Sequence, residues 1–216
     1  IMQHLIALGM PGPTEWIIIA GIALLIFGKR LPEVGRSLGK GIVEFKKGLR
    51  GMEEEIRRLP GVTHVGLTSQ LPLTGSGSLS PFAYDDATAR NWESATADGR
   101  GASPHYFRAL GTRLLAGRFF EERDRGANVI IIDETLAARA WPGENAVGKR
   151  LQTQPTGSPN AHSEVVGVIE HVRSQDLARA VRPQIFRPLI GFGGTQPFVV
   201  VRTTVDPGSL IPAVRQ

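Results

Sequence analysis

A short apolar run at residues 16–27 limits most strongly what this chain can fold into. As a helix, residues 16–28 would extend only about 20 Å, against roughly 30 Å for the core of a bilayer. The run is apolar on every side and so has no polar face to meet water. A signal peptide is not expected, because Lys29 and Arg30 follow the run and no Lys or Arg precedes it. A buried core helix is the alternative, but the composition favours insertion into a membrane.

A basic amphipathic helix is predicted to follow directly, at residues 29–56. Most of its lysines and arginines lie away from its apolar side, as is typical of a helix lying on an anionic bilayer. A coiled-coil seam or an ordinary packed helix would show the same spacing, but five glycines between residues 35 and 51 oppose a rigid coiled coil. The apolar side chains recur every three or four residues, as on one side of a helix, and are Leu31, Val34, Leu38, Ile42, Phe45, Leu49, Met52, Ile56 and Leu59.

The positive charge of the chain is concentrated in this N-terminal part. Residues 1–50 contain seven Lys and Arg against three acidic residues, a net charge of +4. The remaining residues contain eighteen against seventeen, a net charge of +1. This distribution opposes a nucleic-acid-binding protein with a basic face over its whole surface. The chain has no cysteine, which excludes disulfides, thiolate chemistry and cysteine-based zinc sites.

Several motifs in residues 9–55 occur in the order and spacing of a known family: GPTEW at 12–16, FGKRLPE at 27–33, GRSLGK at 35–40 and FKKG at 45–48. The segment resembles the TatA/TatE family of the twin-arginine translocation system. The resemblance implies a single-pass protein of the bacterial inner membrane, with its N-terminus outside and its C-terminus in the cytoplasm. It also implies self-association, TatB- and TatC-like partners, contact with anionic lipid, and folded cargo that carries twin-arginine signal peptides.

The same resemblance implies roles for individual residues. Glu15 takes the polar position near the outer end of the span, where a carboxyl group either contacts a partner or is a solvated residue at a helix start. Phe27 and Gly28 match the hinge before the surface helix, where glycine permits a turn. Phe45 matches an aromatic residue that anchors the helix in the membrane. The expected functional set is Glu15, Phe27, Gly28, Leu31, Pro32, Phe45, Lys46 and Lys47.

From about residue 57 the chain is predicted to form an α+β domain. Short apolar segments bounded by Gly, Pro and Asp predict strands at 62–68, 129–132, 165–169 and 198–202. Helices are predicted at 104–110, at 134–141 and from Pro207, and a loop at 75–78. The whole chain is therefore expected to form a short transmembrane α-helix and an amphipathic α-helix in an L shape, followed by a truncated α+β domain.

Residues 57–216 resemble a second family, the MacB-like periplasmic core domain of ABC transporter permeases. The matching motifs include LPGV at 59–62, SPHYFRALG at 103–111, DETLA at 133–137, WPGE at 141–144, GKR at 148–150 and VVVRT at 199–203. The resemblance implies a non-catalytic domain outside the membrane that works in conformational coupling or substrate handling. The match is a fragment that stops at Gln216, so poor stability or association is expected for residues 57–216 alone.

The two resemblances imply opposite sides of the membrane for the C-terminal part, as in a natural, designed or accidental fusion. The favoured function is a component of the twin-arginine translocase, because residues 9–55 form a complete module. The alternative is a membrane-anchored, non-catalytic extracytoplasmic domain of an ABC-type permease or efflux system. The expected divisions are an outer segment at 1–14, a span at 15–28, a surface helix at 29–56 and the α+β domain at 57–216.

No catalytic set is predicted, and neither an enzyme, a cofactor nor a nucleic-acid partner is expected. Residues 143–150 approach a P-loop, but Arg150 stands where Ser or Thr would hold magnesium, so a turn into a strand at Leu151 is expected. The adjacent pairs Asp85-Asp86 and Glu121-Glu122 are interpreted as loop charges. The histidines lack metal-ligand spacing and are interpreted as surface or loop residues; they are His4, His64, His105, His162 and His171.

Overall fold

The computed structural model describes residues 40, 41, 44, 47–49, 51–72, 74, 78–84, 95–173, 181–189 and 197–214. The chain separates into two compact units between Arg50 and Gly51. In the first unit the described residues, 40, 41, 44 and 47–49, are helical. In the second unit residues 51–57 form a helix that ends in a turn at 58–61. The predicted span and the L-shaped arrangement lie outside the described residues.

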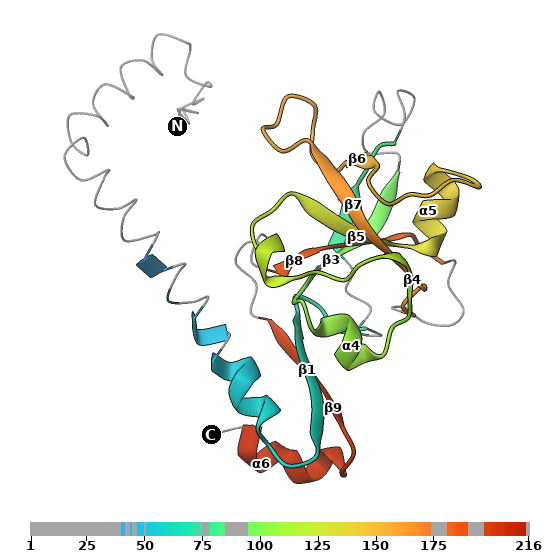
Figure 1. The fold of residues 1–216 in the computed structure, drawn as a ribbon. Coiled ribbons are helices and arrows are strands. Elements are labelled where there is room, and N and C mark those ends of the chain that lie inside the picture. The colour runs from blue at the N-terminus through green and yellow to red at the C-terminus, as the bar shows by residue number, and fades with distance from the viewer. Residues whose placement is uncertain are drawn as a thin grey trace, which may run out of the picture. The chain divides into compact units, whose positions relative to one another are not determined.

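A mixed sheet forms the body of the second unit (Figure 1). Among the described residues its strands run in the order β4-β7-β5-β8-β3-β1-β9, with β2 paired to β3 and β6 paired to β7. The pairs β5–β7 and β3–β8 are parallel, and the others are antiparallel. The strands are β1 (Val62–Thr68), β2 (Ser78–Pro81), β3 (Thr96–Ala102), β4 (Leu114–Gly117), β5 (Val129–Asp133), β6 (Arg150–Gln152), β7 (His162–Ile169), β8 (Gln184–Pro188) and β9 (Phe198–Thr203).

Among the described residues, short helices lie between the strands and after the last one. Those between strands are α4 (Tyr106–Leu110), α5 (Glu134–Ala140) and the 3-10 turn η1 (Glu122–Asp124). The 3-10 turn η3 (Pro207–Leu210) and α6 (Ile211–Val214) follow β9. Asp133 is the N-cap of helix α5, and its side chain accepts the backbone N–H of Leu136. Helix α4 ends at Gly111, which adopts a left-handed φ of 78° and donates to Phe107 O and Arg108 O.

Two apolar cores lie on the two faces of the sheet. Successive residues of a strand point to opposite faces, so Ile131 joins one core and Ile132 the other. The first core includes Leu136 of α5, and the second includes Phe107 of α4. A register shift between β5 and β7 after Ile130 keeps both faces apolar across the bulge. The sheet is thus buried on both faces, and α4 and α5 cover different ones.

Strands β1 and β9 form a ribbon that extends from the sheet (Figure 1). They pair along the whole of β1, whereas β1 meets β3 only through the pair Thr68↔Ala102. Helix α4 covers this ribbon, and Nε of Arg202 on β9 donates to the backbone oxygen of Ala109 at 3.0 Å. Strand pairing therefore joins the ribbon to the body of the sheet at one end, and α4 supports it along its length.

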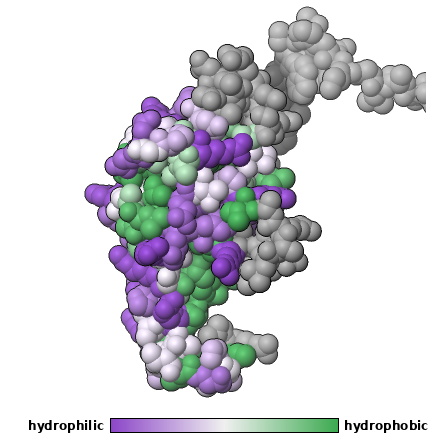
Figure 2. All heavy atoms as spheres, turned by 90° about the vertical axis from the view of Figure 1, so that its right-hand side faces the viewer, coloured by the Kyte–Doolittle hydropathy of each residue, from purple (hydrophilic) through white to green (hydrophobic). Residues whose placement is uncertain are grey.

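Exposed apolar side chains are scattered over the second unit. Figure 2 shows hydrophobic and hydrophilic residues alternating over one face of the molecule. The large apolar side chains that are exposed among the described residues come from separate segments and are Leu79, Leu115, Val181, Phe198, Val205 and Ile211. Isolated residues of this kind are normal on a protein surface.

The prediction of a mixed α and β domain in the C-terminal part is confirmed. Strands appear at all four predicted positions, and helices appear at 106–110 and 134–140, close to their predicted bounds. The loop prediction at 75–78 is wrong at Ser78, which begins β2 by pairing with Gly99. Strands β2, β3, β4 and β8 were not predicted, because they contain glycine, proline or charged residues and lack a β-branched apolar run.

Candidate functional site

The expected functional residues lie almost entirely outside the described part of the chain. Lys47 is the exception, and it is exposed on a helical segment. The roles of the other residues stay predictions, because these residues lie outside the described part of the chain. They are Glu15, Phe27, Gly28, Leu31, Pro32, Phe45 and Lys46. Among the described residues, no helix has both the length and the apolar character needed to span a bilayer.

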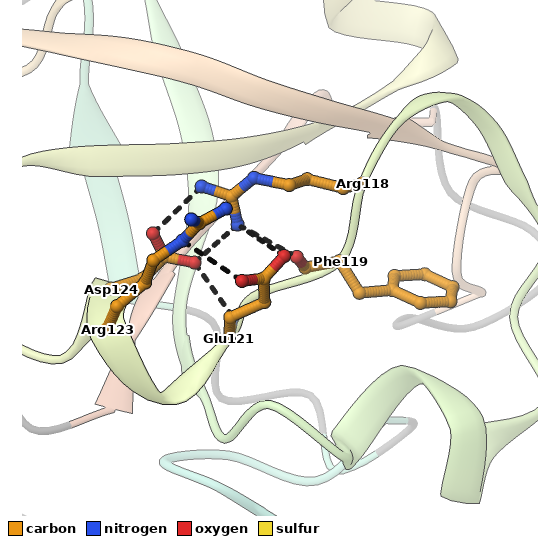
Figure 3. Close-up of polar contacts among 5 residues, drawn as sticks. All are labelled: Arg118, Phe119, Glu121, Arg123 and Asp124. Carbon is orange, nitrogen blue, oxygen red and sulfur yellow. Dashed lines mark hydrogen bonds and ion pairs between the residues drawn. The ribbon is translucent and has the colours of Figure 1, made fainter.

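A bidentate ion pair joins Arg118, which follows β4, to Asp124 at the end of η1 (Figure 3). Nη1 of Arg118 donates to Oδ2 of Asp124 at 2.5 Å, and Nη2 donates to Oδ1 at 2.9 Å. The same Oδ2 accepts the backbone N–H of Glu121 at 2.7 Å. Because the backbone N–H of Arg118 also donates to Val166 O at 3.0 Å, the pair fastens the η1 loop to β7.

The charges of this cluster stabilise one another. Hydrogen bonds from Arg118 lower the pKa of Asp124, which is itself buried. The same bonds raise the pKa of Arg118. Arg123 approaches Glu121 at 3.0 Å, but both side chains are exposed, so this contact contributes little. Both terminal nitrogens of Arg118 and both carboxylate oxygens of Asp124 are engaged within the loop, which indicates a structural role.

A second polar cluster is centred on Asp133, which is fully buried. Its Oδ1 accepts the backbone N–H groups of Leu136 and Gln184, each at 3.0 Å. Its Oδ2 lies 2.7 Å from Nδ1 of His171. The side chain of Gln184 in turn bonds both backbone groups of Val172, at 3.0 Å and 2.7 Å. One carboxylate thus joins the start of α5 to β8 and to the segment after β7.

A third cluster lies where helix 51–57 meets the segment before α4. Glu53 is 4% exposed, and the side chain of Ser103 hydrogen-bonds it. Beyond Ser103, Arg125 forms a two-contact pair with Glu122, from Nε to Oε2 at 2.6 Å and from Nη2 to Oε1 at 2.7 Å. His105 lies in the same charged surroundings, and burial together with nearby arginines lowers its pKa.

Arg100 on β3 is a buried cation on the α4 side of the sheet. It is 2% exposed, and its Nε and Nη1 atoms have no hydrogen-bond partner among the described residues. Burial lowers the pKa of Arg100, and neighbouring Tyr106 and Asp98 act in the opposite direction. Burial also raises the pKa of Tyr106, so its hydroxyl stays protonated over the physiological range.

A polar surface cavity of about 460 Å³ lies where the β6–β7 hairpin meets the start of β5. Nδ2 of Asn128 donates to His162 O at 2.5 Å, and its Oδ1 accepts from Ser163 Oγ at 2.7 Å. The exposed side chains of Arg150 and Glu164 also line the cavity. Its lining includes one cation and one anion, and Pro159 and Ala161 are its apolar residues, so it lacks the largely apolar walls typical of a small-molecule pocket.

The P-loop-like segment and one of the two acidic pairs lie in turns of the sheet domain. Residues 143–150 form a turn between α5 and β6, as predicted, although β6 begins at Arg150. Glu121 and Glu122 belong to the η1 turn, and Asp85 and Asp86 lie outside the described residues. Among the described residues no group of three or more His, Asp or Glu gathers as metal ligands do.

Most contacts within the polar clusters could not be predicted from the sequence. Asp133 before a predicted helix carried a usable signal, because aspartate is a favoured N-cap. Nothing in the sequence links it to His171, which is 38 residues away. The burial of Glu53 could not be predicted either, because a glutamate beside two others on a basic helix is usually a solvated charge.

Comparisons with known proteins divide the chain into two overlapping parts. The pattern of the mttA/Hcf106 family matches residues 10–55. The pattern of the MacB-like periplasmic core domain matches residues 42–216. The two matches share residues 42–55, which are helical wherever the structure describes them. The overlap of the two patterns thus contains the boundary between the two compact units, at residues 50 and 51.

Individual relatives support the same division. The chain is 50% identical over 57 residues to the Sec-independent protein translocase protein TatA of Trichodesmium erythraeum, covering 26% of this chain and 62% of that protein. It is 51% identical over 49 residues to TatA of Alkaliphilus oremlandii, covering 22% of this chain and 77% of that protein. The periplasmic region of MacB from Actinobacillus actinomycetemcomitans has a similar fold, with a TM-score of 0.51, 16% identity, and coverage of 76% of this chain and 69% of that one.

Proposed function

We propose that this chain is a membrane component of the twin-arginine protein translocase that carries a MacB-like sheet domain. The chain belongs to the MacB-like periplasmic core domain family in residues 42–216 and to the mttA/Hcf106 family in residues 10–55. The observation that carries the proposal is the identity of 50% over 57 residues with a TatA protein. The chain self-associates, works with TatB- and TatC-like partners, and lets folded proteins with twin-arginine signal peptides cross the bacterial inner membrane.

The proposed arrangement assigns one task to each segment. Residues 1–14 lie outside, residues 15–28 span the membrane, residues 29–56 lie on its cytoplasmic surface, and residues 57–216 are cytoplasmic. The positive charge of +4 in residues 1–50 supports this orientation, because basic residues are retained on the cytoplasmic side. The sheet domain acts as a non-catalytic module that contacts other proteins.

Within this arrangement the N-terminal residues have distinct roles. Glu15 contacts a partner at the outer end of the span, and Gly28 gives the turn between span and surface helix, next to Phe27. Phe45 inserts between lipid chains, while the basic side chains of Lys46 and Lys47 attract anionic headgroups. Leu31 and Pro32 form the first turn of the surface helix.

A second candidate function places the sheet domain on the other side of the membrane. In this alternative the chain is an anchored extracytoplasmic domain of an ABC-type permease or efflux system. The family match over residues 42–216, most of the chain, favours this candidate. The two candidates differ in the compartment of the sheet domain, so its location separates them.

Complementation tests the first candidate. The chain is expressed from Met2 in bacteria that lack TatA-type proteins, and export of a folded reporter with a twin-arginine signal is followed. Restored export is expected, with loss of export in Phe45→Ala and retention in the matched variant Glu44→Ala, since Glu44 is exposed. Rescue by residues 2–55 but not by the full chain would mean that the sheet domain blocks assembly or reverses the topology.

Cysteine labelling tests the compartment, because the natural chain contains no cysteine. Ala127 is exposed, and Ala97 is fully buried, so Ala127→Cys and Ala97→Cys form a matched pair in the same domain. A membrane-impermeant maleimide added to intact cells should leave Ala127→Cys unlabelled if the domain is cytoplasmic. Labelling of Ala127→Cys in an otherwise intact cell, with Ala97→Cys still protected, would support the permease-type alternative.

A further inference from the structure

Two side chains of helix 51–57 are buried against the sheet domain, one apolar and one titratable, and Met52 is partly buried beside them. Ile56 and Glu53 are 5% and 4% exposed, and they lie three residues apart on one helix face. Glu54, Glu55 and Arg57 are exposed on the same helix. Glu53 is therefore the titratable side chain of this helix that is buried against the domain.

The surroundings of Glu53 do not satisfy a carboxylate. Its Oε1 atom is buried and has no hydrogen-bond partner among the described residues. The hydroxyl of Ser103 hydrogen-bonds the carboxyl group and accepts the backbone N–H of Leu67 at 2.9 Å. One hydroxyl donor cannot replace the water that an ionised carboxylate loses on burial. The protonated acid, which carries no charge, fits this position better.

The charged groups that face Glu53 do not cancel its charge. Arg125 is engaged by Glu122 through two contacts of 2.6 Å and 2.7 Å. Arg57 is exposed, and water screens its attraction. Glu122 itself repels an ionised Glu53. Burial is the largest influence, and it raises the pKa of Glu53 above the ordinary value of 4.5.

We propose that Glu53 is a proton-controlled latch, which holds helix 51–57 on the sheet domain while its carboxyl group is protonated and releases the helix when that group ionises. The stabilisation that protonated Glu53 gives to docking is fully present below the ordinary pKa of 4.5 and is lost as the pH rises towards the raised pKa of the docked group. Within that interval the docking equilibrium changes by up to about tenfold per pH unit. Release would lengthen the connection between the first unit and β1.

His105, which precedes α4, titrates in the opposite sense. Its pKa is lowered by burial first and by Arg57 and Arg108 next, so its contribution is lost as the pH falls below the ordinary value of 6.5. The two linkages have opposite signs, because the pKa of Glu53 is raised and that of His105 is lowered. A comparison of variants that both retain His105 therefore isolates the effect of Glu53.

Amide hydrogen exchange of residues 53–57 tests the latch in the full chain, held in lipid nanodiscs, from about pH 5 to pH 9. Each rate is divided by the intrinsic rate at that pH. Protection in the wild type should fall relative to Glu53→Gln as the pH rises, by up to about tenfold per unit. Glu54→Gln, which changes the exposed neighbour, should follow the wild type. Identical pH profiles for the wild type and Glu53→Gln, or wild-type protection that rises with pH relative to that of Glu53→Gln, would overturn the proposal.

Ser103→Ala provides a second test that keeps Glu53. Removal of the hydroxyl takes away a bond that favours the carboxylate, so the docked pKa rises and the fall in protection extends to higher pH. A profile unchanged from the wild type would contradict the latch even where Glu53→Gln does not fold. The measurement is independent of the proposed translocase function, because it reports on helix 51–57 whether or not export is restored.

Discussion

Oδ2 of Asp133 lies 2.7 Å from Nδ1 of His171, a residue 38 positions later in the chain. This contact joins the N-cap of α5 to the segment that follows β7. Asp133 also accepts two buried backbone N–H groups, so it is the acceptor on which three segments depend. Its loss would leave those donors unpaired in the interior.

Asp133→Ala is therefore expected to destabilise the sheet domain by about 2 to 4 kcal/mol, from the lost N-cap and the unpaired buried donors. Glu134→Ala, at the exposed next position, should cost less than about 1 kcal/mol. Urea unfolding of the full chain, with equal slopes for the two variants, measures the difference. Equal unfolding midpoints for the two variants would show that Asp133 is not the central acceptor.

The Arg118–Asp124 pair predicts an acid-sensitive loop. The pKa of Asp124 is lowered, so the stability that it contributes is present above the ordinary value of 3.8 and is lost as the pH falls below it. Amide exchange in residues 118–124 should accelerate in this acid range beyond the intrinsic change. Asp124→Asn should abolish the acid dependence, while Arg123→Gln, which removes only an exposed contact, should retain it.

Phe107 is expected to be the most sensitive aromatic residue of the α4-side core. Its ring lies 5.0 Å from that of Phe186 and 5.4 Å from that of Phe119, and it is fully buried. Phe107→Ala should cost about 3 to 5 kcal/mol, as for other large core truncations. Phe198→Ala is the matched control, because Phe198 is 46% exposed. A loss of stability in the control as large as that in Phe107→Ala would place the core elsewhere.

The same substitution, glycine to alanine, should have opposite effects at two positions, because an added Cβ atom has space at one and not at the other. A Cβ on Gly66 would lie 2.4 Å from the Cα of Tyr106, so Gly66→Ala should force β1 and α4 apart and destabilise the domain by about 2 kcal/mol or more. A Cβ on helical Gly51 meets nothing within 4 Å, and Gly51→Ala should stabilise the helix by up to about 1 kcal/mol. Thermal unfolding of both variants measures the contrast, and a neutral Gly66→Ala would disprove the close approach.

The length of the apolar run gives a prediction for transport. Insertion of about four leucines into residues 16–27 should reduce export strongly, because a longer span no longer strains the bilayer around an assembly. Ile22→Leu keeps the length and should retain export. Full export by the lengthened variant in the complementation assay would contradict a mechanism based on membrane thinning.

The sequence predicts those elements whose pattern is locally complete. Strands β1, β5, β7 and β9 are rich in valine or isoleucine, and their positions were correctly predicted. Strand β3 was missed because its sequence, TADGRGA, has no apolar run, and its burial comes from partners distant in the chain. Strand β8 was missed for a similar reason, since its residues are buried through parallel pairing with β3.

The polar contacts depend even more on tertiary structure. The burial of Glu53 could not be predicted, since Glu54 and Glu55 beside it are exposed and only helix docking distinguishes the three. The pairing of Asp133 with His171 similarly requires β5 and β7 to lie side by side. The N-terminal motifs, in contrast, are contiguous in sequence, so they indicate a family without reference to any tertiary contact.

The attachment of the β1–β9 ribbon has a mechanical consequence. Once helix 51–57 is released from the domain, a pull along it would reach the ribbon first at the bond from Thr204 N to Gly61 O and then at the pair Val62↔Thr203. Antiparallel pairs loaded from one end separate in succession, so the ribbon would open stepwise at low force. The body of the sheet, joined to β1 through the pair Thr68↔Ala102 at the far end of the strand, would be loaded last.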